Sequence, residues 1–145
     1  MIKISPNSSC PCGSRKKYKK CCAVYHKGAL PKNALLLMES RYSAYALANS
    51  NYIIKTTHPN NSDYSINIEE WSRTIKQFTN STEFLKLEVL EAVEFGDEAF
   101  VIFKAKLSSG DMLEKSRFLK VNNRWLYESG EIIISTVNSA YPTVL

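Results

Sequence analysis

Hydrophobic residues recur at helical spacing over residues 34–47. Asn33 precedes this stretch, and an asparagine at such a place accepts a hydrogen bond from a free backbone N–H of the first helical turn. The pattern therefore predicts a helix that begins after Asn33 and ends near residues 49–51. Its apolar positions are Leu35, Leu36, Met38, Tyr42, Tyr45, Ala46 and Leu47.

Two further helices and a set of strands are predicted beyond this helix. One helix spans 52–57 and stops before Pro59, because a residue that precedes proline avoids helical geometry, and another spans 68–78. From residue 83 the spacing becomes strand-like with short turns, so neighbouring strands run antiparallel. The strands are 84–95, 99–107, 112–121 and 124–127, and Ile132, Ile133 and Ile134 either extend the last strand or begin a tail. This order predicts an α+β fold in which helices cover one face of a curved antiparallel sheet.

Basic residues and cysteines both concentrate near the N-terminus. The chain has 145 residues, which is room for one ordinary domain and a small appendage. Residues 1–32 carry eight Lys or Arg and no acidic residue, whereas the rest of the chain has a net charge of −3. The four cysteines lie in the same basic segment. Because the two shifts coincide, we expect a small module over residues 1–30 and a body over residues 31–145.

No stretch of the sequence is expected to enter a membrane. The most apolar run, residues 34–38, is far shorter than the roughly 18 residues that span a bilayer. Residues 1–9 offer no apolar core for a secretory signal. We therefore expect a cytoplasmic protein whose cysteines stay reduced.

Four reduced cysteines within a short segment indicate a metal site. A segment this small cannot stabilise itself by a hydrophobic core, and a bound metal supplies the missing folding free energy. Zinc suits four thiolates, which bind it tetrahedrally and leave no position for a reacting water. We therefore expect one structural Zn²⁺ per chain. A free-thiol or redox function is the alternative, and His26 is expected to be a surface histidine that could replace one ligand.

The adjacent pair Cys21 and Cys22 constrains the geometry of such a site. Neighbouring residues on a helix diverge by roughly 100°, so both bind one ion only at a turn or at a helix start. After Cys10-Pro11-Cys12, Gly13 can take a positive φ, which lets two sulfur atoms converge. The surrounding lysines favour the thiolate form.

Residues 10–22, read as CPCGSRKKYKKCC, resemble the SEC-C motif, the zinc-binding tail of the SecA translocase that also occurs in other proteins. The resemblance implies that Tyr18 is an inward aromatic of the loop and that Gly13 and Ser14 form its turn. In SecA the similar tail contacts the acidic chaperone SecB, which implies a chaperone, a translocase or a ribosome-associated protein as partner. The ligands that the resemblance implies are Cys10, Cys12, Cys21 and Cys22.

A second resemblance covers most of the remaining chain. Residues 34–59, the triplet at 116–118 (SRF) and residues 124–127 (RWLY) are similar to the YchJ-like family of small bacterial proteins. The resemblance implies that the body has the nuclear transport factor 2-like (NTF2-like, cystatin-like) fold, a cone of helices on a curved sheet. It implies a fold and a metal site, but no catalytic residues and no reaction.

Candidate pocket residues of the body each have a structural explanation as well. The two arginines either line a pocket or pair with acids such as Glu39 and Glu128, and the histidine is either a base or a loop residue. The three aromatic residues stand at core spacing. The sequence shows no nucleophile with an orienting base and no phosphate-binding loop, so we do not expect an enzyme. The candidates are Arg41, Tyr42, His58, Trp71, Arg117 and Trp125.

Three functions remain open. The first is a non-catalytic zinc protein whose basic surface binds an acidic protein partner. The second is a small-molecule binder, or an enzyme of unrecognised activity, that uses a pocket of the body. The third is nucleic-acid binding through the same basic surface, with Tyr18 as a stacking residue. A monomer and a homodimer both agree with the sequence, and the basic surface consists of Arg15, Lys16, Lys17, Lys19 and Lys20.

Overall fold

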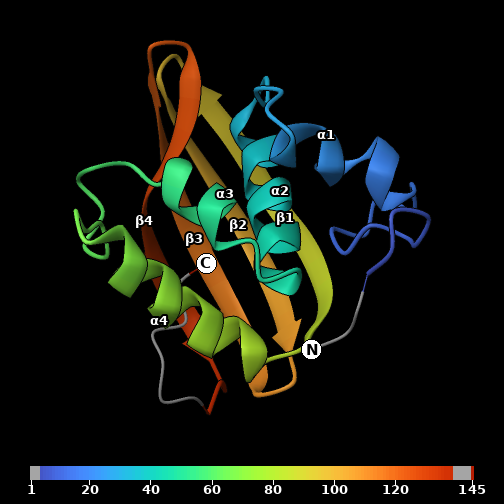
Figure 1. Ribbon diagram of the computed structural model, residues 1–145. Helices are drawn as coiled ribbons and strands as arrows, with labels where there is room; N and C mark the ends of the chain where they lie inside the picture. Colours follow the sequence, from blue (N-terminus) through green and yellow to red (C-terminus); the bar gives the residue numbers. More distant parts are fainter. Residues whose placement is uncertain (1–3, 139–144) are drawn as a thin grey trace.

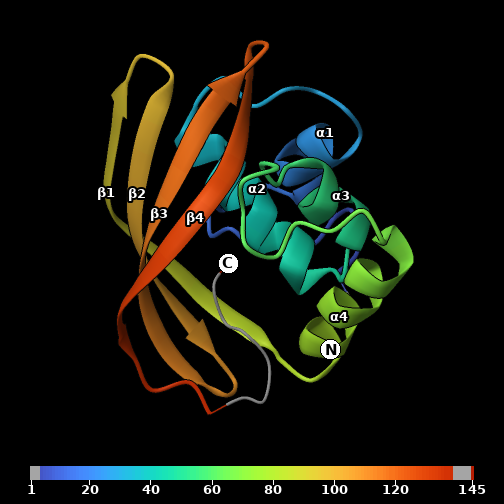
Figure 2. The ribbon, with the colours of Figure 1, turned by 90° about the vertical axis from the view of Figure 1, so that its left-hand side faces the viewer.

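The computed structural model describes residues 4–138 and Leu145, and Lys3 of the basic segment lies outside them. A four-stranded antiparallel sheet in the order β1-β2-β3-β4 forms one layer, and the helices cover one of its faces (Figure 1, Figure 2). The predicted α+β fold is confirmed. The elements are η1 (Tyr18–Lys20), α1 (Cys22–His26), α2 (Ala34–Ala46), α3 (Ser50–Lys55), α4 (Ile68–Asn80), β1 (Phe84–Phe95), β2 (Glu98–Leu107), β3 (Gly110–Val121) and β4 (Arg124–Ser135).

The helix boundaries differ from the predicted ones at the junction of α2 and α3. Asn33 caps α2 as predicted, and its side chain accepts a hydrogen bond from a first-turn N–H (2.8 Å). α2 ends at Ala46, because Ala48 adopts a positive φ of 55° and the next residue, Asn49, caps α3. α3 therefore begins two residues before its predicted start and ends at Lys55. α4 keeps its predicted start and runs two residues further.

The sheet is bent by irregular pairing. β4 continues through Ile132, Ile133 and Ile134, so these residues extend the strand and do not begin a tail. Register shifts interrupt the pairing of β1 with β2 and of β3 with β4, at two places each. Such bulges increase the local twist and bend the strands, which curves the sheet around the helices.

One hydrophobic core fills the space between the two layers. α4 turns Trp71, Ile75 and Phe78 inward at the spacing of an amphipathic helix. Alternate residues of β2 and β3 face the same core. Leu145 is also buried, and its N–H donates to the Glu114 carboxyl (2.8 Å). Across residues 4–138 and Leu145, no helix combines the length and the apolar character needed to cross a membrane.

Candidate metal centre

The first two cysteines flank a tight turn. A hydrogen bond from the Gly13 N–H to the Cys10 carbonyl (3.1 Å) closes this turn, and Gly13 adopts a φ of +84°. Glycine takes such a φ without steric cost, so Cys10 and Cys12 approach each other without backbone strain. A backbone bridge between Ser9 and Lys17 closes the loop that follows.

The other two cysteines lie at a helix start. Cys21 occupies the N-cap position of α1 with non-helical backbone angles (φ −125°, ψ −113°), and Cys22 is the first helical residue. Because the chain changes direction between them, their side chains escape the roughly 100° separation of a continuous helix. The structure thus meets the geometric condition that the sequence sets for adjacent ligands.

All four sulfur atoms lie within 4.8 Å of one another, and all four cysteines are free thiols. Cys12 Sγ and Cys21 Sγ are 3.6 Å apart. Four thiolates at about 2.3 Å from a zinc ion stand roughly 3.8 Å from each other. Cys21 is half-buried and the other three side chains are buried. The donor set therefore fits a tetrahedral dication.

Hydroxyl groups contact these sulfur atoms from two parts of the chain. Ser43, on α2, donates to Cys22 Sγ (3.2 Å), and its Oγ lies 3.5 Å from Cys10 Sγ. Ser14 Oγ lies 3.1 Å from Cys21 Sγ. Contacts of this kind orient metal ligands and tune the metal. The cysteine cluster is therefore completed by a helix of the body.

The clustered thiols shift each other's acidity. Hydrogen bonding with Cys12 lowers the pKa of Cys10. Hydrogen bonding with Cys10 raises the pKa of Cys12 to about 12 and the pKa of Cys22 far above its usual range, and burial adds to both rises. The raised pKa values mean that Cys12 and Cys22 favour the protonated thiol when no cation is bound. A bound dication would reverse this preference and stabilise all four thiolates.

His26 joins the N-terminal segment to α2 and is not the expected surface histidine. Its Nε2–H donates to the Ser40 carbonyl (2.8 Å), and its Nδ1 accepts from the Tyr18 hydroxyl (2.6 Å). We assign this tautomer because a carbonyl oxygen only accepts. The imidazole also packs against the Tyr52 ring. Burial lowers the pKa of His26, which favours the neutral form that both hydrogen bonds need.

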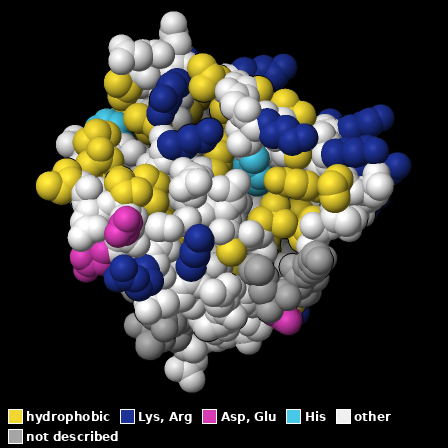
Figure 3. All heavy atoms as spheres, viewed as in Figure 1, with side chains coloured by type: hydrophobic (Ala, Val, Ile, Leu, Met, Phe, Trp, Pro, Cys, Tyr) yellow, Lys and Arg dark blue, Asp and Glu magenta, His cyan; other side chains and the backbone are white. Residues whose placement is uncertain are grey.

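The basic side chains of the N-terminal segment are exposed to solvent. Figure 3 shows Lys and Arg side chains gathered on the side of the molecule where the N-terminal loops and α1 lie in Figure 1. Within the described part of the chain, none of the five residues of the predicted basic surface forms an ion pair. These exposed residues are Arg15, Lys16, Lys17, Lys19 and Lys20.

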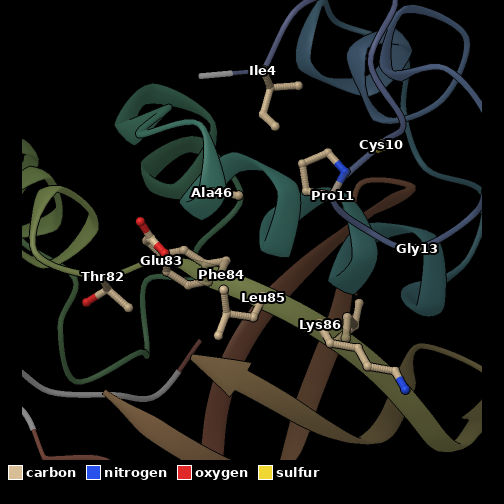
Figure 4. Close-up of a pocket in the computed structure, with 11 residues that line it drawn as sticks. Ile4, Cys10, Pro11, Gly13, Ala46, Thr82, Glu83, Phe84, Leu85 and Lys86 are labelled. Atoms are coloured by element: carbon tan, nitrogen blue, oxygen red, sulfur yellow. The ribbon is translucent and has the colours of Figure 1, made fainter. Parts of the chain in front are cut away.

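A groove of about 330 Å³ separates the first cysteine loop from the edge of the sheet (Figure 4). Cys10, Pro11 and Gly13 line one side of the groove, and the first residues of β1 line the other. A Cβ atom at Gly13 would lie 3.9 Å from the Leu87 carbonyl oxygen. The cysteine loop thus stands close to β1 without sealing against it.

The six candidate pocket residues do not form one site. Arg41 and Trp71 line a small cavity inside the body. Trp125 borders a different hollow, together with residues of the segment after α1. Arg117 pairs with the predicted Glu128 (2.8 Å) and also with Glu98 (2.6 Å), so it serves an ion-pair network.

The remaining candidates have structural contacts. Tyr42 is buried and packs edge to face on Phe84. The backbone N–H of His58 donates to the Tyr127 carbonyl (2.8 Å), and the His58 Nδ1 accepts from the Asn60 N–H (3.0 Å). These contacts fix the loop after α3 onto β4. His58 is thus a loop residue in this structure.

Two residues that matter for these sites escaped the sequence analysis. Ser43 contacts the cysteine cluster, but it stands 21 residues after Cys22, and no local pattern links the two. Glu114 is fully buried in β3. Glu114 stands between Met112 and Ser116, which also point toward the core. An acidic residue at a position where the strand alternation predicts an inward side chain could have identified it from the sequence.

Comparison with known proteins identifies both parts of the chain. The family described as YchJ, middle NTF2-like domain matches residues 33–130, and the SEC-C motif matches residues 7–23. A UPF0225 protein of Serratia proteamaculans is 38% identical over 130 residues, which cover 83% of this chain and 81% of that protein. A UPF0225 protein of Vibrio parahaemolyticus is 40% identical over 130 residues, with coverages of 85% and 74%.

Two solved structures resemble nearly the whole chain. The solution structure of a SEC-C motif containing protein from Rhodopseudomonas palustris has a TM-score of 0.73 and 31% identity, and covers 88% of this chain and 100% of that one. The crystal structure of a SEC-C motif containing protein from Psychrobacter arcticus has a TM-score of 0.72 and 27% identity, with coverages of 89% and 85%. The sheet with its layer of helices, the cysteine cluster and both family matches agree, and the chain therefore belongs to the YchJ-like family, the UPF0225 proteins, in which a SEC-C motif precedes an NTF2-like domain.

Proposed function

We propose that this protein is a non-catalytic zinc protein whose N-terminal module, residues 1–30, presents a basic protein-binding surface on the body, residues 31–145. The observation that carries this proposal is the cluster of four cysteine sulfur atoms within 4.8 Å, set in a segment of exposed basic side chains. One structural Zn²⁺ per chain is held by Cys10, Cys12, Cys21 and Cys22. Four thiolates leave no coordination position for a reacting water, which argues against metal-dependent catalysis.

The partner in this proposal is a protein with an acidic surface, such as a chaperone, a translocase or a ribosome-associated protein. Metal binding supplies folding free energy to a short segment, so the bound ion gives the basic loop a lasting shape. Complementary charge then speeds encounter with the partner and fixes its orientation. A cytoplasmic location belongs to the same proposal, because the four thiols must stay reduced to bind the metal.

The two other functions receive less support. The space inside the cone is largely filled, because Tyr42, Trp71 and Trp125 are at most 7% exposed. The cavity beside Arg41 measures about 20 Å³, which is too small for a metabolite. Nucleic-acid binding would use Tyr18 for stacking, but this residue is half-buried and its hydroxyl is bonded to His26.

The first experiment is native mass spectrometry of the untagged chain, purified without chelator. We expect one zinc ion per chain, which is lost in a Cys21→Ser variant. A metal-free chain whose mass is reduced by disulfide formation would refute the zinc centre. The same spectrum reports whether the protein is a monomer or a homodimer.

The second experiment tests the basic surface by partner capture with two matched fourfold variants. The first variant replaces Lys16, Lys17, Lys19 and Lys20 with glutamine and keeps every cysteine. The control replaces four exposed lysines of the body, which are Lys76, Lys104, Lys106 and Lys115.

We expect nuclease-treated lysate to yield partners that bind the wild type and the control but not the first variant, and that dissociate as salt is added. Identical partners for all three proteins would refute the protein-binding surface. Partners that disappear after nuclease treatment would favour nucleic acid instead.

A further inference from the structure

A hollow of about 160 Å³ lies where the segment after α1 meets the body. Ala29, Leu30 and Pro31 line it from that segment, and the buried rings of Tyr52 on α3 and Trp125 on β4 line it from the body. An apolar cavity of roughly 150 Å³ is enough to hold a benzene ring. The hollow is therefore large enough for one aromatic ring.

Two cationic side chains border the same hollow. Lys55, the last residue of α3, and Arg124, the first residue of β4, both line it and are exposed. Arg124 Nη2 donates to the Lys55 carbonyl oxygen (2.9 Å), which uses one of the five guanidinium N–H groups. The Lys55 ammonium lies 5.4 Å from the centre of the Tyr52 ring. Both side chains therefore offer N–H donors to a ligand in the hollow.

No acid balances these charges at short range. Among the described residues, none that lines the hollow is acidic, and neither Lys55 nor Arg124 has a carboxylate within 4.0 Å. A third cation, Lys120, lies 4.9 Å from the centre of the Trp125 ring. Figure 3 shows Lys and Arg side chains beside hydrophobic ones, with no acidic side chain between them, where the β3–β4 turn lies above α3 in Figure 1. Cations gathered in this way create a positive potential that attracts an anion.

We propose that this hollow binds a small aromatic carboxylic acid in its ionised form. The ring of the ligand lies against Tyr52 and Trp125, and its carboxylate accepts hydrogen bonds from Lys55 and Arg124. Aromatic rings in contact attract each other beyond the burial of their surface, and hydrogen bonds between ionised groups are the strong ones. None of the lining residues belongs to the cysteine cluster or to the basic surface, so the inference goes beyond the proposed function and does not depend on it.

A nuclear magnetic resonance titration of the metal-loaded full chain with benzoate, at constant ionic strength, tests this site. The amide signals of residues 28–30, 55–56 and 124–125 should shift in a saturable way. Benzoate has about nine non-hydrogen atoms, for which ordinary ligand efficiency predicts a Kd of roughly 10 mM or lower. Benzamide, which has the same shape without the charge, and acetate, which lacks the ring, should each bind roughly tenfold more weakly.

Variants of the two cations test the contacts directly, and both residues are exposed, so the variants should fold normally. Lys55→Gln and Arg124→Gln should each weaken benzoate binding roughly three- to tenfold. The matched controls are Lys76→Gln and Arg73→Gln, which replace exposed residues of α4. These controls should leave the affinity unchanged.

Three results would overturn the proposal. Equal affinities for benzoate and benzamide would mean that the carboxylate is not recognised. Shifts that never saturate, or that appear at residues 15–20 in place of residues 28–30, would mean unspecific attraction of an anion. Equal benzoate affinities for the two cation variants and their controls would exclude Lys55 and Arg124 as ligand contacts. All of these variants keep the basic surface intact, so the results are independent of partner capture.

Discussion

Replacing Ser43 with alanine tests whether the body helps to hold the proposed zinc ion. Ser43 is fully buried on α2, donates to Cys22 Sγ (3.2 Å) and lies 3.5 Å from Cys10 Sγ. A hydrogen bond to a charged group contributes about 1.5–3 kcal/mol, and about 1.4 kcal/mol corresponds to a tenfold change in affinity. We therefore expect Ser43→Ala to weaken zinc binding roughly 10- to 100-fold, as is usual when a contact to a metal ligand is lost.

Competition with a chromophoric chelator measures this affinity in the full chain. Ser40→Ala is the matched control, because Ser40 is also fully buried on α2 but bonds to the Tyr52 hydroxyl (2.7 Å) and the Leu37 carbonyl (2.9 Å). Each variant should lose about 1 kcal/mol of folding free energy with its hydroxyl. Only Ser43→Ala should change the zinc affinity. Unchanged affinity in Ser43→Ala, or an equal loss in both variants, would refute the reasoning.

Three further predictions concern the junction with α2, a buried acid and a turn. His26→Ala removes the hydrogen bonds that join the N-terminal segment to α2. Calorimetry should therefore show that chelation of the metal lowers the melting temperature of this variant less than that of the wild type. An equal loss in both proteins would contradict the coupling between the metal centre and the body. Burial raises the pKa of Glu114 above the ordinary value of 4.5. The protonated Glu114 side chain therefore contributes its full stabilisation below pH 4.5, and this contribution is lost as the pH rises through the raised pKa. Glu114→Gln should therefore flatten the urea-unfolding profile above pH 4.5, and a profile parallel to that of the wild type would count against the shift. Gly110→Ala should lower the free energy of unfolding by about 3 kcal/mol or more, because the φ of Gly110 is +136° and a Cβ would overlap the Thr136 carbonyl. Gly96→Ala is the control and should lower it by only about 1–2 kcal/mol, because Gly96 has a φ of +64° and a Cβ there would meet open space. Equal losses in urea unfolding would disprove the overlap.

Local causes made much of this protein predictable from its sequence. Asn33 caps α2 through its own side chain, and the apolar phase of residues 68–78 places one face of α4 in the core. Short turns select antiparallel neighbours, so the strand order follows the chain order. The clustering of the four cysteines in space also follows from a short spacing, with a glycine turn at one pair and a helix start at the other.

The tertiary structure decided what depends on residues that are distant along the chain. Ser43 reaches the cysteines, and His26 reaches Ser40, only because α1 packs beside α2. The early end of α2 depends on the positive φ of Ala48, which propensity alone disfavours. The buried position of Arg41, with its contacts to the Ile53 carbonyl and the Tyr127 ring, likewise results from the packing of α2 against α3 and β4. A single sequence encodes such contacts through the whole fold, because side chains far apart in the chain meet only after the helices and the sheet have packed.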